Sequence, residues 1–276
     1  MAKLRNVDID ANDINEFLEN HDDLALELFV LKKARDSGFN AIHGGFYTDP
    51  LTGKPRQYDV RASIGLHQRK IAFAIECKSL KSFYPLIISR MKRISAESYF
   101  QYIVSEGAKK NYSNQPINPA RIVTLEPNYS IYRVGEYVGK STIQIGRNEQ
   151  GDFTFGDSEV YDKWTQAINS AKDIIFASFP NVTGTEVPIH TAIIPILVVP
   201  DKTLWVIDYA DNGAVRVGPT QVDEAVYYID KEYESPIGQP YKISHLHFYT
   251  KKGICALFNN IANKYDEEYW EKLFNY

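Results

Sequence analysis

Residues 56–78, RQYDVRASIGLHQRKIAFAIECK, decide the fold of this chain of 276 residues. They hold two alternating runs, 56–64 and 70–78, and each run predicts a β-strand with one apolar face. In the second run, Ile71, Phe73, Ile75 and Cys77 share one face, and Ala72, Ala74, Glu76 and Lys78 share the other. The small alanines leave room for another element above that second face.

Two acidic residues in these strands suggest a metal site. Residues i and i+2 of a strand lie on one side, about 6.6 Å apart, so Glu76 and Lys78 are neighbours. Asp59 joins them if its strand pairs alongside. Two converging carboxylates attract a hard cation such as Mg²⁺ or Mn²⁺. A lysine beside the metal can position and help deprotonate water, and can stabilise charge that develops on phosphorus oxygens.

The charge distribution favours a polyanionic ligand. Residues 54–110 hold twelve Lys or Arg and four Asp or Glu, although the net charge of the whole chain is −4. A basic block that contains the two acids suits phosphate contacts, so we expect nucleic acid as the partner.

Helical patterns flank the strands. Residues 13–36 read as helical with a break at 20–23, and the second helix places Glu27 in its apolar stripe. Residues 49–54 predict a hairpin turn. Between 79 and 186 we expect a long insertion of helices and irregular segments. Its expected helices are residues 95–104 and 160–177.

The C-terminal third predicts further strands and closing helices. Residues 193–199 and 204–209 predict a hairpin, residues 241–249 another strand, and residues 253–276 one or two helices.

The motifs together resemble the PD-(D/E)xK superfamily of restriction-endonuclease-like nucleases. The matching residues are a helix with Glu27, then Tyr58-Asp59-Val60, then the apolar strand ending in Glu76-Cys77-Lys78. Tyr58 stands where the family name has proline. The resemblance implies an α/β fold, a mixed central sheet flanked by helices, with the long insertion after the catalytic strand.

The resemblance also implies roles for these residues. Asp59 and Glu76 are the expected ligands of Mg²⁺ or Mn²⁺, Lys78 the catalytic lysine, and Glu27 a helical acid of the site. The expected activity is metal-dependent endonucleolytic hydrolysis, of DNA rather than RNA, in restriction, repair or anti-phage defence. We expect one nuclease domain, with its core at about 20–80 and 187–250 and C-terminal helices at 251–276.

Other interpretations stay open. A nuclease-like subunit without catalysis could bind nucleic acid or a partner protein. A different hydrolase could use His245 and His247, although an exposed strand face is the expectation for both. Glu76 and Lys78 could also form a simple ion pair on an edge strand. His43, which precedes two glycines, is expected to be a turn or surface residue.

Composition indicates where the protein acts. No stretch reaches the roughly 20 apolar residues that cross a bilayer, and the polar start, MAKLRN, lacks the apolar region of a signal peptide. Cys77 and Cys255 are too few for a disulfide framework, and we expect both to pack as small side chains. These features predict a cytoplasmic protein without a membrane segment. No DNA-reading module is evident, so any sequence specificity is expected to come from the insertion or from a partner protein, and the absence favours non-specific cleavage under external control. A regulatory partner protein and a homo-oligomer are the expected alternatives for its assembly.

Overall fold

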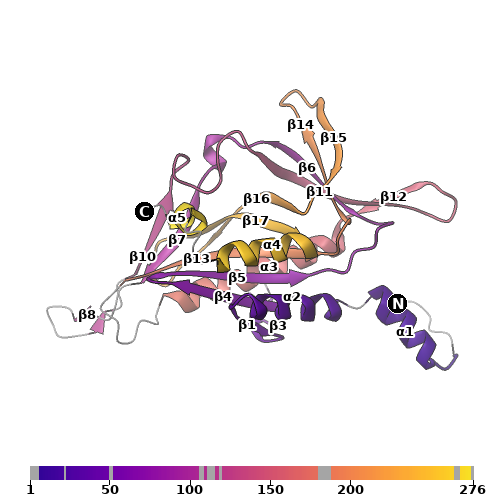
Figure 1. Ribbon diagram of the computed structural model, residues 1–276, viewed down its shortest axis with the longest axis horizontal. Helices are drawn as coiled ribbons and strands as arrows, with labels where there is room; N and C mark the ends of the chain where they lie inside the picture. The colour runs from indigo at the N-terminus through magenta and orange to yellow at the C-terminus, as the bar shows by residue number, and fades with distance from the viewer. Residues whose placement is uncertain are drawn as a thin grey trace.

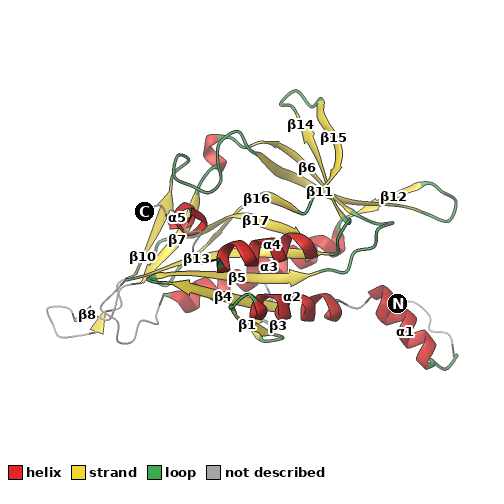
Figure 2. Ribbon diagram, in the orientation of Figure 1, coloured by secondary structure: helices red, strands yellow, loops and turns green. Residues whose placement is uncertain are grey.

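The computed structural model describes residues 6–21, 23–49, 52–105, 109–110, 116–117, 120–179, 188–263 and 268–274. These residues form an α/β fold around a large mixed sheet, with few helices (Figures 1 and 2). None of the helices described is both long and apolar enough to cross a membrane.

The part of the fold that holds the acidic residues is built from two stretches of the chain, 24–77 and 158–199. It comprises α2 (Leu24–Asp36), β1 (Asn40–His43), β4 (Val60–Leu66), β5 (Arg69–Cys77), α3 (Ser158–Ser178) and β13 (Ile189–Val199). β1 pairs with β4, and β4 with β5, both antiparallel, whereas β13 runs parallel to β5. Helix α3 precedes β13, as expected for a connection between parallel strands.

The register between β4 and β5 brings the two acids together. Val60 pairs with Ile75, and the two strands are antiparallel. The residue before Val60, Asp59, therefore lies beside the residue after Ile75, Glu76. On the other side of β5, Glu76 pairs with Leu197 of β13. Glu76 therefore lies in the interior of the sheet, between two neighbouring strands.

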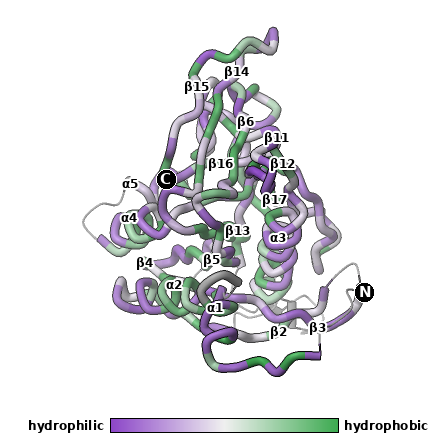
Figure 3. Tube along the Cα trace, turned by 90° about the vertical axis from the view of Figure 1, so that its right-hand side faces the viewer, coloured by the Kyte–Doolittle hydropathy of each residue, from purple (hydrophilic) through white to green (hydrophobic). Residues whose placement is uncertain are grey.

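Helices cover both faces of this part of the sheet. On one face, Phe73 and Ile75 pack with α2 and with α4 (Lys251–Ala262) in the main hydrophobic core. On the other, Ala72 and Ala74 pack against Ile168 and other side chains of α3. The side view shows β5 and β13 between α4 and α3 (Figure 3). The space above the alanines, expected from the sequence, is thus filled by α3.

The sheet continues well beyond this part. Its further strands are β17 (Tyr241–Thr250), β16 (Glu224–Tyr233), β11 (Tyr137–Arg147), β6 (Leu86–Lys92), β14 (Leu204–Tyr209) and β15 (Val215–Gln221), in that order after β13. β7 (Phe100–Ser105) pairs with β13 and with β10 (Ala120–Leu125), and β12 (Phe153–Gly156) pairs with β11. The smaller elements are α1 (Ala11–His21), β2 (Phe46–Thr48), β3 (Pro55–Gln57), a 3₁₀ turn at Ser95–Glu97, β8 (Lys109–Lys110), β9 (Pro116–Ile117) and α5 (Glu268–Phe274).

Three expectations about the elements are wrong. The segment 79–186 is not mainly helices and irregular segments, because it contributes β6, β7, β10, β11 and β12 to the large sheet. Residues 95–104 form a short turn and a strand instead of a helix. The strands at 193–199 and 204–209 exist but do not form a hairpin, since β14 pairs with β6 and β15. In each case long-range strand pairing overrides the local pattern.

Candidate active site

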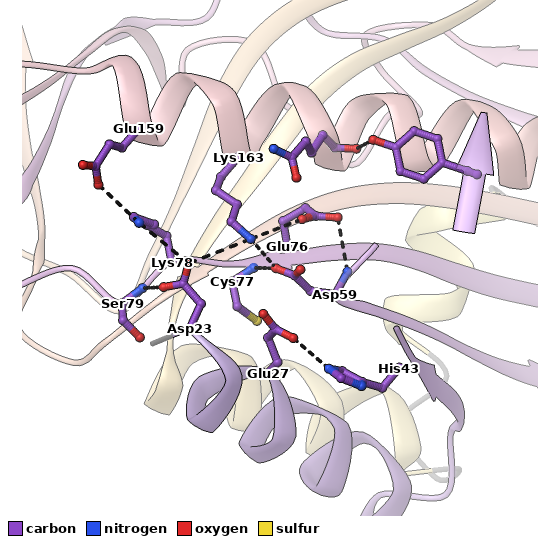
Figure 4. A network of polar contacts seen from close by, with 12 residues as sticks. Asp23, Glu27, His43, Asp59, Glu76, Cys77, Lys78, Ser79, Glu159 and Lys163 are labelled. Atoms are coloured by element: carbon purple, nitrogen blue, oxygen red, sulfur yellow. Dashed lines mark hydrogen bonds and ion pairs between the residues drawn. The ribbon is translucent and has the colours of Figure 1, made fainter. Parts of the chain in front are cut away.

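Asp59 and Glu76 form the centre of the candidate site. Asp59 directly precedes β4 and is 8% exposed, and Glu76 in β5 is fully buried. The backbone N–H of Asp59 donates to Glu76 Oε1 at 3.4 Å, and the N–H of Cys77 donates to Asp59 Oδ2 at 2.8 Å. Each carboxylate therefore accepts a backbone hydrogen bond from the chain segment that carries the other one, and this fixes their relative position (Figure 4).

Glu76 has bonding capacity that the protein leaves unused. Among the described residues, no donor forms a hydrogen bond with Glu76 Oε2, although the atom is buried. Burial, and then the charge of Asp59, raise the pKa of Glu76 well above its ordinary value. A buried carboxylate oxygen without a partner is costly, so it indicates a place where a ligand can bind.

Lys163 of α3 reaches both carboxylates. Its Nζ donates to Asp59 Oδ2 at 2.9 Å and lies 3.7 Å from Glu76 Oε2, beyond hydrogen-bond distance. Burial acts to lower the pKa of Lys163, but the charges of Asp59 and Glu76 outweigh it and raise that pKa. This lysine is therefore held as a cation against the acidic pair (Figure 4).

Lys78 lies near this centre but contacts other acids. Its Nζ is 3.2 Å from Glu159 Oε2 at the start of α3 and 3.7 Å from Asp23 Oδ2. Asp23 precedes α2, accepts a hydrogen bond from the N–H of Ser79 at 2.6 Å, and also lies 3.9 Å from Lys163 Nζ. Asp23 thus links the two lysines at the end of β5.

Glu27 approaches the centre from α2. Its Oε2 lies 2.7 Å from His43 Nε2, so His43 belongs to the polar network and the expectation of a turn or surface residue is wrong. Burial, followed by the charge of Asp59, raises the pKa of Glu27, and His43 and Lys163 oppose that rise. The chain thus places all four expected site residues, Glu27, Asp59, Glu76 and Lys78, around one end of β5.

The donor set of this centre fits magnesium better than zinc. The described residues contain no group of three His, Cys, Asp or Glu side chains placed to hold a metal ion. Mg²⁺ does not require such a cage, because proteins usually hold it by one or two carboxylates while waters and substrate phosphates complete its shell. Asp59 and the oxygen of Glu76 that accepts no hydrogen bond from the described residues would supply that set. Lys163 occupies the same carboxylates, so a bound cation would displace it or share them.

Part of the basic block pairs with acidic residues of the fold. Four of its arginines form ion pairs: Arg56 with Asp49, Arg61 with Asp173, Arg90 with Asp208 and Arg93 with Glu136, at 2.7 to 3.2 Å. Their charges are neutralised locally, which limits their contribution to binding a phosphate backbone.

His245 and His247 are not on an exposed strand face, so that expectation is wrong. Both are buried in β17, where Tyr132 stacks on His245 and its hydroxyl lies 2.8 Å from His247 Nε2. Burial and the charge of Arg93 lower the pKa of His245 well below its usual range and that of His247 to about 3. Neutral, enclosed histidines of this kind fit a structural role.

The sequence interpretation missed Lys163 and Asp23. Lys163 follows Val160 by three residues, on the border of the apolar stripe of the expected helix, and its side chain is only 18% exposed. A lysine at the edge of a buried helix face is the signal that could have identified it. For Asp23, a position just before a helix suggests a cap, but its side chain makes no cap hydrogen bond. It bonds instead across the fold to Ser79.

Comparisons of the chain with protein-family models, with curated proteins and with solved structures find no match.

The raised pKa of Glu76 gives a test by stability. Because the pKa of Glu76 is raised in the folded state, the protonated side chain contributes to the free energy of unfolding. This contribution is fully present below about pH 4.3, the usual pKa of glutamate in an unfolded chain, and is lost as the pH rises through the folded-state pKa. Glu76→Gln removes this loss, because the amide stays neutral. In EDTA near pH 8 we expect the variant to melt about 2–4 °C above wild type, the shift that ~1 kcal/mol produces in a domain of this size.

Calorimetry of both proteins from pH 4 to 8 measures this difference. The gap between the two melting temperatures should grow with pH. A gap that is constant, or that shrinks as the pH rises, would contradict a destabilising charge on Glu76.

Proposed function

We propose that this protein is a Mg²⁺- or Mn²⁺-dependent nuclease that hydrolyses phosphodiester bonds. The observation that carries the proposal is the pair of buried carboxylates, Asp59 and Glu76, with one Glu76 oxygen that accepts no hydrogen bond from the described residues and two lysines at the same end of β5. The order of α2, β1, β4 and β5 in a mixed sheet flanked by helices supports a restriction-endonuclease-like fold.

The residues fall into three roles in this proposal. Asp59 and Glu76 hold the metal, which when bound polarises a phosphate oxygen and lowers the pKa of its water. Lys78 and Lys163 position water and stabilise negative charge on the phosphate. Glu27 is a third acid near this pair. Its contact with His43 holds it in place, and it orients the polar network around the pair.

The substrate and setting come from the motif resemblance. It favours DNA over RNA and a role in restriction, repair or anti-phage defence. Because the chain carries no evident DNA-reading module, control by a partner protein or by self-association is part of the proposal.

A cleavage panel tests the proposal directly. Purified protein is incubated with supercoiled plasmid, linear duplex, single-stranded DNA and RNA, each with Mg²⁺, Mn²⁺ or EDTA. We expect cleavage of at least one DNA substrate with either metal and none in EDTA. Cleavage that persists in EDTA would overturn the metal-dependent proposal.

The rival function is a nuclease-like subunit that binds nucleic acid or a partner without cutting. Clustered carboxylates repel phosphate unless a cation lies between them, so a pure binding subunit gains nothing from Asp59 and Glu76. Thermal melting with millimolar Mg²⁺ or Mn²⁺ separates the two. Nucleic-acid binding without cleavage and without any metal-induced rise in melting temperature would favour the rival.

A further inference from the structure

A cavity of about 470 Å³ lies between α3 and β16, apart from the carboxylate pair. Its volume is within the range of about 300–1,000 Å³ that is usual for small-molecule sites. The exposed residues Lys231 and Glu232 belong to its wall, so it reaches the protein surface. None of the residues proposed for catalysis lines it.

Aromatic rings form much of the wall. Tyr161 and Trp164 of α3 meet edge to face, with ring centroids 4.6 Å apart, and Trp164 lies 6.1 Å from the ring of Tyr227 in β16. Tyr161 is half exposed, so part of this aromatic wall is open to solvent. Rings arranged in this way offer faces on which a flat aromatic ligand can stack.

Polar groups complete the wall. Trp164 Nε1 and Thr165 Oγ1 are buried and have no hydrogen-bond partner among the described residues. Lys172 supplies a cation, with its Nζ 5.5 Å from the ring centre of Tyr233, and Lys231 supplies another. Stacking surfaces, unused hydrogen-bonding atoms and lysines together match a nucleobase attached to a phosphate.

The cavity and the carboxylate pair share one helix and one face of the sheet. Lys163 of α3 contacts Asp59, and the next residues, Trp164 and Thr165, line the cavity. The face of β5 that holds Ala72, Ala74 and Glu76 is the face on which α3 packs, and Tyr233 of β16 belongs to the same hydrophobic cluster. From β5 to β16 there are three strand spacings, or about 14 Å.

We propose that this cavity binds an unstacked nucleobase of a single-stranded segment whose backbone passes the carboxylate pair. A base in a duplex is stacked and paired, so the cavity selects strands whose bases are free to leave the stack. The same chemistry would accept a free nucleotide, and the test distinguishes the two sources. The inference deepens the proposed nuclease function and rests on it, because that function identifies the bound strand as the substrate. Binding of the base can nevertheless be measured without any cleavage.

The test measures affinity in EDTA, where cleavage is not expected. Fluorescence anisotropy follows the full chain binding to a labelled oligothymidylate, and to an abasic strand of equal length. The variants are Tyr161→Ala, which removes an accessible ring, and Tyr161→Phe, which keeps it. Tyr129→Ala is the matched control, because Tyr129 is similarly exposed and lies outside the cavity wall.

We expect Tyr161→Ala to weaken binding of the base-bearing strand about tenfold and to leave the abasic strand unaffected. Tyr161→Phe should restore the affinity, and Tyr129→Ala should bind as wild type does. Thymidine monophosphate that binds with the same dependence on Tyr161, while neither strand binds, would identify a free nucleotide as the source of the base.

Two results would overturn the inference. One is an equal effect of Tyr161→Ala on both strands, or no effect on either. The other is the absence of binding by wild type to strands and mononucleotide alike. Failure of the nuclease proposal looks different, since base binding that depends on Tyr161 would persist in a protein that cleaves nothing with metal.

Discussion

Asparagine in place of Asp59 is expected to reduce metal-dependent cleavage by about a thousandfold or more. The change removes one negative charge from the pair that holds the metal, while its amide oxygen can still accept the hydrogen bond from the N–H of Cys77. Loss of several kcal/mol of metal-derived stabilisation corresponds to that factor, at 1.36 kcal/mol per tenfold. Single-turnover cleavage of the substrate that wild type prefers measures it.

A second readout separates loss of the metal from loss of the fold. Wild type should melt at a higher temperature with millimolar Mg²⁺ than in EDTA, and Asp59→Asn should show no such shift. Asp173→Asn is the matched control: it neutralises a carboxylate that pairs with Arg61, outside the metal centre. If Asp59→Asn keeps both the shift and the cleavage, Asp59 is not a metal ligand.

The closeness of Asp59 and Glu76 could be predicted from the sequence because the strand pattern behind it is local. Alternation in residues 56–64 and 70–78 places Asp59 and Glu76 on one side of neighbouring strands, and the pairing of Val60 with Ile75 in the structure brings them together. The structure splits the first run at Tyr58 and Asp59, so Asp59 precedes β4 instead of lying within it. The alternation nevertheless predicted that the side chains of Asp59 and Glu76 lie on the same face of the sheet, and this was enough to identify them as a pair.

The strands within 79–186 and the contacts of Lys163 could not be predicted, because they depend on partners distant in sequence. Phe100 to Ser105 forms a strand through pairing with β13 and β10, although its apolar residues also fit a helix. Lys163 lies 104 residues after Asp59, and only the packing of α3 over Ala72 and Ala74 brings its side chain to the carboxylates. Contacts of this kind leave no pattern in any single window of the sequence.

Methionine at Lys163 and methionine at Lys78 should have different consequences, although both should slow cleavage by about a hundredfold or more. Lys163 and a metal ion compete for the same two carboxylates, since its Nζ lies 2.9 Å from Asp59 and 3.7 Å from Glu76. Removal of that competing cation should tighten Mg²⁺ binding while turnover falls. Lys78 pairs with Asp23 and Glu159 instead, so Lys78→Met should leave the Mg²⁺ affinity nearly unchanged.

Calorimetric titration of Mg²⁺ and single-turnover cleavage at saturating metal measure the two effects separately. Lys32→Met is the matched control, because Lys32 pairs with Asp36 on the exposed side of α2. Wild-type turnover by Lys163→Met would show that this lysine only neutralises the empty acidic pair, and would leave Lys78 as the catalytic lysine that the motif implies. Weaker Mg²⁺ binding by the same variant would contradict competition, because a cation that shares the carboxylates with the metal can only oppose its binding.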